Sequence, residues 1–373
     1  MTKKSDAPAI RFKGFSDAWE QRKLGDLVDV CSGRDYKHLS EGDIPVYGTG
    51  GYMLSVSEAL SYDKDAIGIG RKGTIDKPYI LKAPFWTVDT LFYAIPREKI
   101  DLNFAFDIFQ NIDWKKKDES TGVPSLSKTA INEIDVLVPQ YFEQQALGEF
   151  FNGIDNLITL HQRKFEKLTN VKKSMLEKMF PQNGSSYPEI RFKGFTDPWE
   201  QRKVQDVADR FDNLRIPVAA NLRVHGTTPY YGANGIQDYV EGFTHDGEFV
   251  LVAEDGANDL KNYPVKCVNG RIWVNNHAHV LQGKAGISDN SFLAFAISQS
   301  DIESLLVGGS RAKLNAETLM SIEFKLPCLQ EQYRIGEYLT QLDNLITLHQ
   351  RKPFLMKWRT SDANRNQTNR LVL

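Results

Sequence analysis

A duplicated segment constrains the fold of this chain more than any other sequence feature. RFKGFSDAWEQRK at 11–23 returns as RFKGFTDPWEQRK at 191–203, identical at eleven of thirteen positions. DNLITLHQRK at 155–164 returns unchanged at 343–352, and weaker matches lie between these two anchors in the same order. The offset drifts only from 180 to 188 residues. Solenoid repeats have periods of about 20 to 50 residues, so this is a tandem duplication of a whole domain with its connector.

Bulk properties place few further limits on the chain. Its 373 residues suffice for two domains with full cores. The start, MTKKSDAPAI, lacks the apolar core of a signal peptide, and no apolar run is long enough for a membrane span, so we expect a cytoplasmic protein. Three scattered cysteines predict neither a disulfide framework nor a zinc site. A formal net charge of −2 means that any nucleic-acid surface must be a local patch.

The middle of each copy reads as short strands separated by turns, with one helical stretch. Segments rich in β-branched and aromatic residues are bounded by Gly, Pro and Asp. The predicted strands are 65–70, 78–82, 91–95, 134–139 and 248–253. The predicted helices, at matching places in the two copies, are 102–114 and 290–306. We therefore expect a mixed α/β fold in each domain.

The end of each copy predicts a long helix. Apolar residues recur every three or four positions from 143 to about 179, with Lys and Glu on the other faces. The second copy repeats this seam up to His349 and then meets Pro353, which a helix interior tolerates poorly. Two such helices would bury their seams as an antiparallel, coiled-coil-like pair, in which the histidines pack or hydrogen-bond between helices. The residues predicted for this seam and its partners are Leu147, Ile154, Leu157, His161, Leu168, Ile335, Leu342, Leu345 and His349.

No catalytic constellation stands out in either copy. YGTGGY at 47–52 is not a nucleotide-binding P-loop, and the second copy replaces Gly50 by Asn234, which favours a tight turn. His277 and His279 are expected to be ordinary strand histidines because no third metal ligand is evident. Two full domains without evident chemistry favour recognition over catalysis, and we predict no catalytic or metal-binding residues.

The turns of both middles carry side chains suited to reading DNA. Arg, Lys, Asn and Thr bond base edges in the major groove, and Arg and Lys neutralise phosphates. The candidates in the first copy are Arg34, Tyr47, Thr49, Arg71, Lys72, Thr74 and Lys128. Those in the second copy are Arg215, Tyr231, Asn234, Arg271, Arg311, Lys313 and Asn315.

The two copies differ most where they would bind. GRKGTID at 70–76 aligns with AEDGAND at 253–259, which exchanges basic for acidic residues in what should be equivalent loops. This divergence predicts two different targets held at a fixed separation by the helices.

The order of these motifs resembles the specificity subunits of type I DNA restriction–modification systems. The resemblance rests on RFKGF at each domain start, YGTGG and YGANG in the middles, and LVPQYFEQQ (137–145) and LPCLQEQ (326–332) before the helices. It covers residues 8 to about 352.

The resemblance implies two tandem target recognition domains joined by spacer helices, with a pseudo-twofold internal repeat. The domain would lie at 1–140 and 183–327, and the helices at 141–182 and 328–373. Such subunits read a bipartite double-stranded DNA target and are not catalytic. Two modification subunits methylate adenine with S-adenosylmethionine, and restriction subunits use ATP and Mg to translocate and cleave DNA.

One departure from this family pattern lies at the end of the chain. After Lys352 the sequence PFLMKWRTSDANRNQTNRLVL loses the heptad and turns polar, which predicts a distal helix shortened after Lys352. The residues alone leave two alternatives open, a bivalent protein-binding scaffold and an enzyme such as a nuclease with an unrecognised site.

Overall fold

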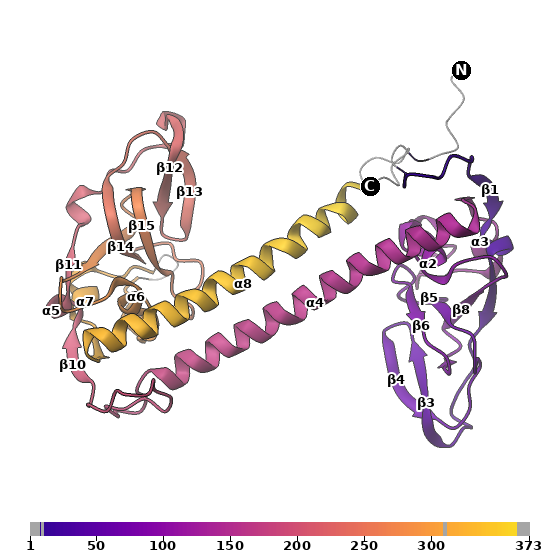
Figure 1. The fold of residues 1–373 in the computed structure, drawn as a ribbon, viewed down its shortest axis with the longest axis horizontal. Helices are drawn as coiled ribbons and strands as arrows, with labels where there is room; N and C mark the ends of the chain where they lie inside the picture. The colour runs from indigo at the N-terminus through magenta and orange to yellow at the C-terminus, as the bar shows by residue number, and fades with distance from the viewer. Residues whose placement is uncertain (1–7, 9–10, 309–311, 364–373) are drawn as a thin grey trace. The chain divides into compact units, whose positions relative to one another are not determined.

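The computed structural model describes residues 8, 11–308 and 312–363, and it divides into two compact units (Figure 1). Unit 1 comprises residues 1–160 and 353–373, and unit 2 comprises residues 161–352. Each unit holds one copy of the duplicated domain. A long helix, α4 (Tyr141–Met179), begins in unit 1 and ends in unit 2.

Unit 1 is a mixed α/β domain with two sheets and a short ladder. A four-stranded sheet has the order β2-β8-β5-β6, a three-stranded sheet has the order β4-β3-β7, and β1 pairs with β9. Its strands are β1 Glu20–Lys23, β2 Val28–Ser32, β3 Glu41–Gly48, β4 Gly51–Val56, β5 Ala66–Gly70, β6 Tyr79–Leu81, β7 Trp86–Thr87, β8 Leu91–Pro96 and β9 Asp135–Val138. Its short helices are α1 Leu24–Leu27, α2 Leu102–Asn111, the 3₁₀ turn Trp114–Lys117 and α3 Lys128–Asn132.

Unit 2 repeats this plan with one continuous sheet. Six strands have the order β11-β16-β14-β15-β12-β13, β10 pairs with β17, and α6 packs against β14 and β15 (Figure 1). Its strands are β10 Glu200–Lys203, β11 Ala208–Arg210, β12 His225–Gly232, β13 Gly235–Val240, β14 His245–Ala253, β15 Val265–Val274, β16 Ala278–Gly283 and β17 Glu323–Leu326. Its helices are α5 Val204–Val207, α6 Asn290–Ser298, α7 Ala316–Ser321 and α8 Leu329–Ala363, with 3₁₀ turns at Asp212–Leu214, Ala220–Leu222 and Glu303–Leu305.

The predicted strands are all present, as β5, β6, β8, β9 and β14. The prediction of one helix over 290–306 is wrong in its extent, because α6 ends at Ser298. The Ser298 and Ser300 hydroxyls donate to the carbonyl oxygens of Phe295 and Ala296 at 2.7 and 3.4 Å. Hydroxyls that bond to helix carbonyls in this way compete with continued helix growth.

In each unit the same set of contacts fixes the start of a long helix to its domain, and we call this set the helix seat. Arg11 donates two hydrogen bonds of 2.6 Å to Glu143 near the start of α4, and Arg191 donates two of 2.8 Å to Glu331 near the start of α8. Both glutamates are buried, with 1% and 0% of the residue exposed. A bidentate guanidinium is the partner that makes burial of a carboxylate tolerable.

A buried glutamine and a glycine complete this helix seat. Gln144 accepts from the Asp101 amide at 3.1 Å and donates to the Pro139 carbonyl at 3.0 Å. Gln332 repeats both bonds with Asp289 and Pro327 at 3.0 and 2.9 Å. Glycine occupies the next turn in both helices because a Cβ on Gly148 or Gly336 would lie 2.5 or 2.7 Å from an oxygen of that aspartate.

Within unit 2 the end of α4 packs antiparallel to α8 (Figure 1). The Nδ1 atoms of His161 and His349 lie 2.8 Å apart, so the interhelix hydrogen bond expected of these histidines is present. Leu168 and Met175 of α4 belong to one apolar cluster with Leu342 of α8.

The backbone of α8 continues through Pro353 to Ala363, where the sequence pattern predicted an interruption. A proline removes one hydrogen bond and bends a helix, but it does not end the helix when good helix formers such as Leu355 and Met356 follow it.

Candidate nucleic-acid interface

A groove in unit 1 lies beside the turn between β3 and β4. It has a volume of about 670 Å³ and is lined by residues of three turns. The lining residues are Asp35–Lys37, Gly48–Met53 and Val88–Thr90. The turn favours glycine at position 51, where φ is +106°, a conformation that other residues rarely adopt. The predicted residue Thr49 therefore lines a groove formed by backbone turns.

Two predicted basic residues approach the same groove from β5. The amides of Arg71 and Lys72 both donate to the carbonyl of Thr90, a groove residue, at 2.8 and 3.3 Å. Both side chains are exposed, and the Arg71 guanidinium also lies 5.7 Å from the Phe92 ring centroid. Arg34 is exposed as well, and its amide donates to Thr87 at 2.8 Å. The structure thus brings Arg34, Thr49, Arg71 and Lys72 to one region.

The other candidates of unit 1 are placed differently. Tyr47 is half-buried and packs against Tyr52 and Tyr79 at centroid distances of 6.4 and 6.1 Å. Thr74 is half-buried, whereas Lys128 is exposed at the first position of α3. The aromatic ring of Tyr47 therefore supports the turn more than it presents a free surface.

In unit 2 the loop at 253–259, which corresponds to the loop at 70–76 of unit 1, is acidic and is neutralised by basic residues of the same unit. The backbone of Asp255 forms an isolated β-bridge with Lys313, as the backbone of Lys72 does with Ser125 in unit 1, so the two loops occupy equivalent backbone positions. Glu254 accepts from Arg215 at 2.6 Å and lies 2.8 Å from the Lys313 ammonium. Two predicted DNA-contacting residues are thus engaged in ion pairs inside the domain.

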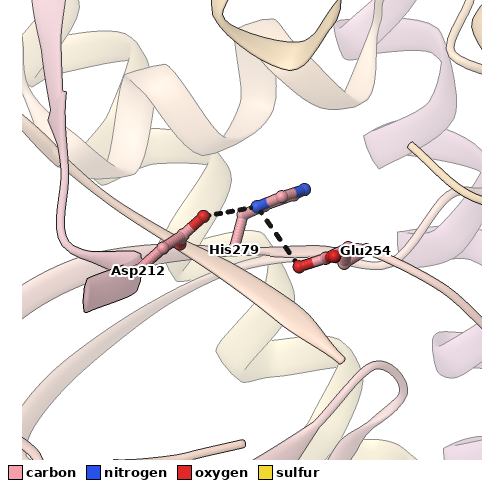
Figure 2. A group of neighbouring side chains, drawn as sticks. All are labelled: Asp212, Glu254 and His279. Atoms are coloured by element: carbon pink, nitrogen blue, oxygen red, sulfur yellow. Dashed lines mark hydrogen bonds and ion pairs between the residues drawn. The ribbon is translucent and has the colours of Figure 1, made fainter. Parts of the chain in front are cut away.

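A buried histidine extends this network (Figure 2). The His279 Nδ1 atom lies 2.7 Å from Asp212 and 3.7 Å from Glu254, and its Nε2 lies 2.9 Å from the Leu314 carbonyl oxygen. Asp212, Glu254 and His279 offer three donor atoms within 4.8 Å of one another, a spacing suited to a metal ion. Protein oxygens already occupy both imidazole nitrogens, and Arg215 and Lys313 already neutralise the carboxylates. The geometry fits a charge network better than a metal site.

Hydrogen bonds set the protonation of both carboxylates in this network. Burial alone would raise the pKa of Asp212, but bonds from His279 and the Val280 amide outweigh it and lower this pKa from its ordinary value. Burial likewise opposes ionisation of Glu254, and its bonds from Lys313 and Arg215 lower its pKa overall. His277, expected to be a strand histidine like His279, lies just before β16 and pairs with Asp255, so that expectation is wrong for His277.

The remaining candidates of unit 2 are dispersed. Tyr231 is buried in the core, with 7% of the residue exposed. Asn234 is exposed in its turn, but its amide bonds Gly256 and Asn258, both at 2.9 Å. Arg271 is exposed, pairs with Asp246 at 3.2 Å and lies 4.8 Å from the Phe243 ring centroid. Asn315 is the residue before α7, and Arg311 lies outside the described residues.

Unit 2 also has a pocket that the sequence did not indicate. It has a volume of about 330 Å³ and is lined by Arg223, Tyr230 and Trp273, among others. The Arg223 guanidinium lies 4.1 Å from the Tyr230 ring centroid, and Trp273 stacks on the same ring at 6.4 Å. The segment 212–224 carries Arg223 and aligns poorly with the first copy, so the repeat gave no signal for it.

The long helices expose an apolar pair in each unit. Leu157 and Leu160 of α4 are 49% and 59% exposed, and their repeat counterparts Leu345 and Leu348 of α8 are 41% and 49% exposed. Other seam residues are covered: Ile335, Leu342 and His349 are buried, and Leu147 and Leu168 pack on the apolar clusters of their units. Ile154 and His161 are half-buried. The prediction that the whole seam is buried is wrong for Leu157 and Leu345.

Comparison with known proteins identifies the family. Residues 16–170 and 196–354 each match the type I restriction modification DNA specificity domain. The chain therefore belongs to this family and carries two of its domains in tandem. Specificity subunits of this family are non-catalytic DNA-recognition subunits.

Individual relatives agree with this assignment. The chain is 42% identical over 163 residues to a putative type I restriction enzyme specificity subunit, S.HindORF215P, of Haemophilus influenzae, a match covering 44% of this chain and 42% of that protein. It is 21% identical over 273 residues to the MjaVIII specificity subunit of Methanocaldococcus jannaschii, covering 64% of this chain and 62% of that protein. The matches thus span less than two thirds of either relative.

A solved structure supports the fold. The S subunit of a type I restriction–modification system from M. genitalium superposes with a TM-score of 0.74 at 12% identity, covering 95% of this chain and 97% of the other. Within the described residues, none of the helices is both long and apolar enough to span a membrane.

Proposed function

We propose that this chain is the specificity subunit of a type I restriction–modification complex and reads a bipartite double-stranded DNA target. One observation carries the proposal: the two units repeat the same helix seat, bond for bond, yet invert the charge of the equivalent loops at 70–76 and 253–259. A shared scaffold with different turn chemistry is suited to two different half-sites.

The groove of unit 1 supplies the first reader. Exposed Arg71 and Lys72 would neutralise phosphates, and Thr49 and Arg34 would approach base edges. Short turns between strands suit this task because a sheet holds them rigidly while their side chains vary.

Unit 2 would read its half-site with fewer free cations. Its acidic loop is neutralised internally, so, within the described residues, Arg271 and Asn234 are the exposed candidates that lie outside the Glu254 ion pairs. Arg223 is a further candidate, because an arginine held over an aromatic ring is oriented before DNA binds. A reader with little net positive charge depends more on direct contacts than on counterion release.

The helices would set the gap between half-sites and bind the modification subunits. The 39 residues of α4 span roughly 58 Å, and half-sites on one DNA face lie about 34 Å apart. The exposed pairs Leu157–Leu160 and Leu345–Leu348 give two equivalent apolar contacts for two copies of one partner. S-adenosylmethionine, ATP and Mg would act in the modification and restriction subunits, in the cytoplasm.

The end of α8 is the part of the proposal most specific to this chain. The seam of α4 continues through Leu168 and Met175, whereas the matching positions of α8 are Met356 and Ala363. We expect weaker assembly than for a chain with two equal helices. Replacing residues 353–368 by the sequence of residues 165–180 should raise the affinity for the modification subunit, and an unchanged affinity would contradict this.

Methylation mapping tests the function directly. The chain is co-expressed with the modification subunit of its own locus, and methylated adenines in host DNA are mapped by single-molecule sequencing. A split motif with a fixed gap is the expected result. A complex that forms without methylating DNA would overturn the assignment as an active specificity subunit, and methylation that needs no copy of this chain would do the same.

A further inference from the structure

An apolar pocket in unit 1 corresponds to a filled site in unit 2. It has a volume of about 150 Å³ and lies between the N-terminal segment, α2 and the start of α4. Trp19 and Phe104 line it, with ring centroids 6.2 Å apart in an edge-to-face contact. Ile108, Leu137, Leu147 and Phe151 form much of the remaining wall.

The repeat identifies what fills the equivalent place in unit 2. There the rings of Trp199 and Phe292 form the same edge-to-face pair, with centroids 5.7 Å apart. The Phe180 ring lies edge-on to the Trp199 ring at 5.9 Å and stacks on the Phe292 ring at 5.5 Å. Phe180 follows the last residue of α4, Met179, and both are buried, at 6% and 3% exposure. The end of a long helix thus packs against the Trp–Phe pair of unit 2.

The second long helix lacks the residues for this role. Counting along the repeat, Leu176, Met179 and Phe180 of the first copy correspond to Asn364, Gln367 and Thr368 of the second. These are polar side chains, and an apolar pocket gains little from them. Trp19 and Phe104 are accordingly 7% and 4% exposed, against 2% and 0% for Trp199 and Phe292.

We propose that the pocket of unit 1 binds the end of an amphipathic helix from another polypeptide, one that carries adjacent bulky apolar residues like the Met179–Phe180 pair. Its chemistry is set by the counterpart site: an aromatic ring to stack on Phe104, a flexible apolar side chain beside it, and a preceding helical turn with an apolar residue. Such a segment would complete unit 1 in trans as α4 completes unit 2 in cis.

A synthetic peptide with the sequence of residues 164–181 tests the proposal on the full-length chain without DNA. Binding of the fluorescently labelled peptide is followed by polarisation. We expect one peptide bound per chain, and a peptide with Met179→Ser and Phe180→Ser should bind at least about tenfold more weakly, given two lost apolar contacts. No binding at about 1 mM peptide, or equal binding of the two peptides, would overturn the proposal.

Chain variants locate the binding site. Leu137 lines the pocket and is 43% exposed, so Leu137→Asp should leave the domain folded and weaken binding about tenfold. Val123→Asp, a matched change at a 66% exposed aliphatic residue outside the pocket wall, should leave binding unchanged, as should Lys325→Asp at the counterpart of Leu137 in unit 2. Loss of binding in Lys325→Asp but not in Leu137→Asp would place the peptide in unit 2 and refute the inference. Circular dichroism of each variant confirms its fold.

Discussion

The two units share their framework and differ in the strand that joins the framework to the turns proposed to read DNA. In unit 2, β15 is ten residues long, pairs with β14 at one end and lies parallel to β12 at the other, so all six strands form one sheet. In unit 1 its counterpart is split into β6 and β7 by a segment that contains Pro84. Proline cannot donate to a strand ladder, and the sheet separates there into two.

The split does not change how the turns proposed to read DNA are attached to the framework. Val46 pairs with Trp86 in unit 1, and Tyr230 pairs with Trp273 in unit 2, both in parallel register. Each tryptophan donates from its indole to a carbonyl of the loop after β2 or β11, at 2.9 and 2.7 Å. The framework therefore tolerates different strand lengths as long as this anchor and the helix seat remain.

The largest effect should come from removing the arginine of either seat. Arg11→Met or Arg191→Met leaves a buried glutamate without its guanidinium partner, and breaking such a pair costs about 3–5 kcal/mol. We expect each variant to lower the free energy of urea unfolding of its own unit by that amount. Amide hydrogen exchange reports the stability of each unit separately and shows whether the loss is confined to the unit that carries the substitution.

The matched control changes an exposed ion pair in the same unit. Arg97 lies 2.6 Å from Asp29, but both side chains are at least half exposed, so Arg97→Met should cost no more than about 1 kcal/mol. Equal effects of Arg11→Met and Arg97→Met would mean that the seat is not what holds α4 to its domain.

The seat and the charge network show what sequence reasoning could reach. The duplication, the α/β class and the long helices followed from repeated words and periodicity, since these depend on local spacing. The candidate binding surface could be predicted only in part. Arg71 and Lys72 form a basic loop that is visible in the sequence, and they stay predicted DNA contacts. The pairing of Arg215 and Lys313 with Glu254 could not be predicted, because it joins segments about 40 and about 60 residues apart.

The next prediction is a pH dependence of the stability of unit 2. At pH values above the ordinary pKa values of Asp212 and Glu254, both carboxyls are ionised in the folded and in the unfolded state. There the lowered pKa values in the fold make their full contribution to the stability of unit 2. This contribution is lost as the pH falls below about 4.5 and through the folded pKa values, because the unfolded state then binds more protons. Arg215→Met should cost unit 2 about 2–3 kcal/mol at pH 7 and progressively less towards pH 3.

Urea unfolding at pH 7, 5 and 3.5 measures this difference. The control is Arg34→Met, at an exposed arginine in the corresponding loop of unit 1, which should change unfolding little at any of these values. A cost for Arg215→Met that is the same at all three values would show that the arginine contributes packing and not charge compensation.

A smaller effect should follow from giving unit 1 the loop charges of unit 2. Arg71→Glu with Lys72→Asp places the residues of 254–255 in the first copy. If both cations contact phosphates, the slope of log affinity against log salt should fall by about 2, and affinity at moderate salt should drop by about tenfold or more. Fluorescence anisotropy with target DNA over a salt series measures both quantities.

The control for this exchange alters charge elsewhere in unit 1. Lys13→Glu with Lys64→Asp changes the net charge by the same amount at two exposed lysines outside the groove wall. If this control lowers the salt slope as much as the loop exchange, the domain attracts DNA by its overall field and the groove is not the reader.

The smallest effect tests a pair of identical residues, one from each copy of the repeat, that lie in contact. His161 and His349 occupy the same position of DNLITLHQRK, and their Nδ1 atoms share a hydrogen bond of 2.8 Å within unit 2. Removing either imidazole should cost about 1 kcal/mol, the usual net value of such a bond. In a double-mutant cycle the effects of His161→Ala and His349→Ala should therefore be non-additive, because the first substitution already breaks the hydrogen bond that the second would break. A coupling energy near zero would mean that Leu168 and Leu342 hold the two helices together without the histidines, so that the repeat retains the pair for a reason other than packing.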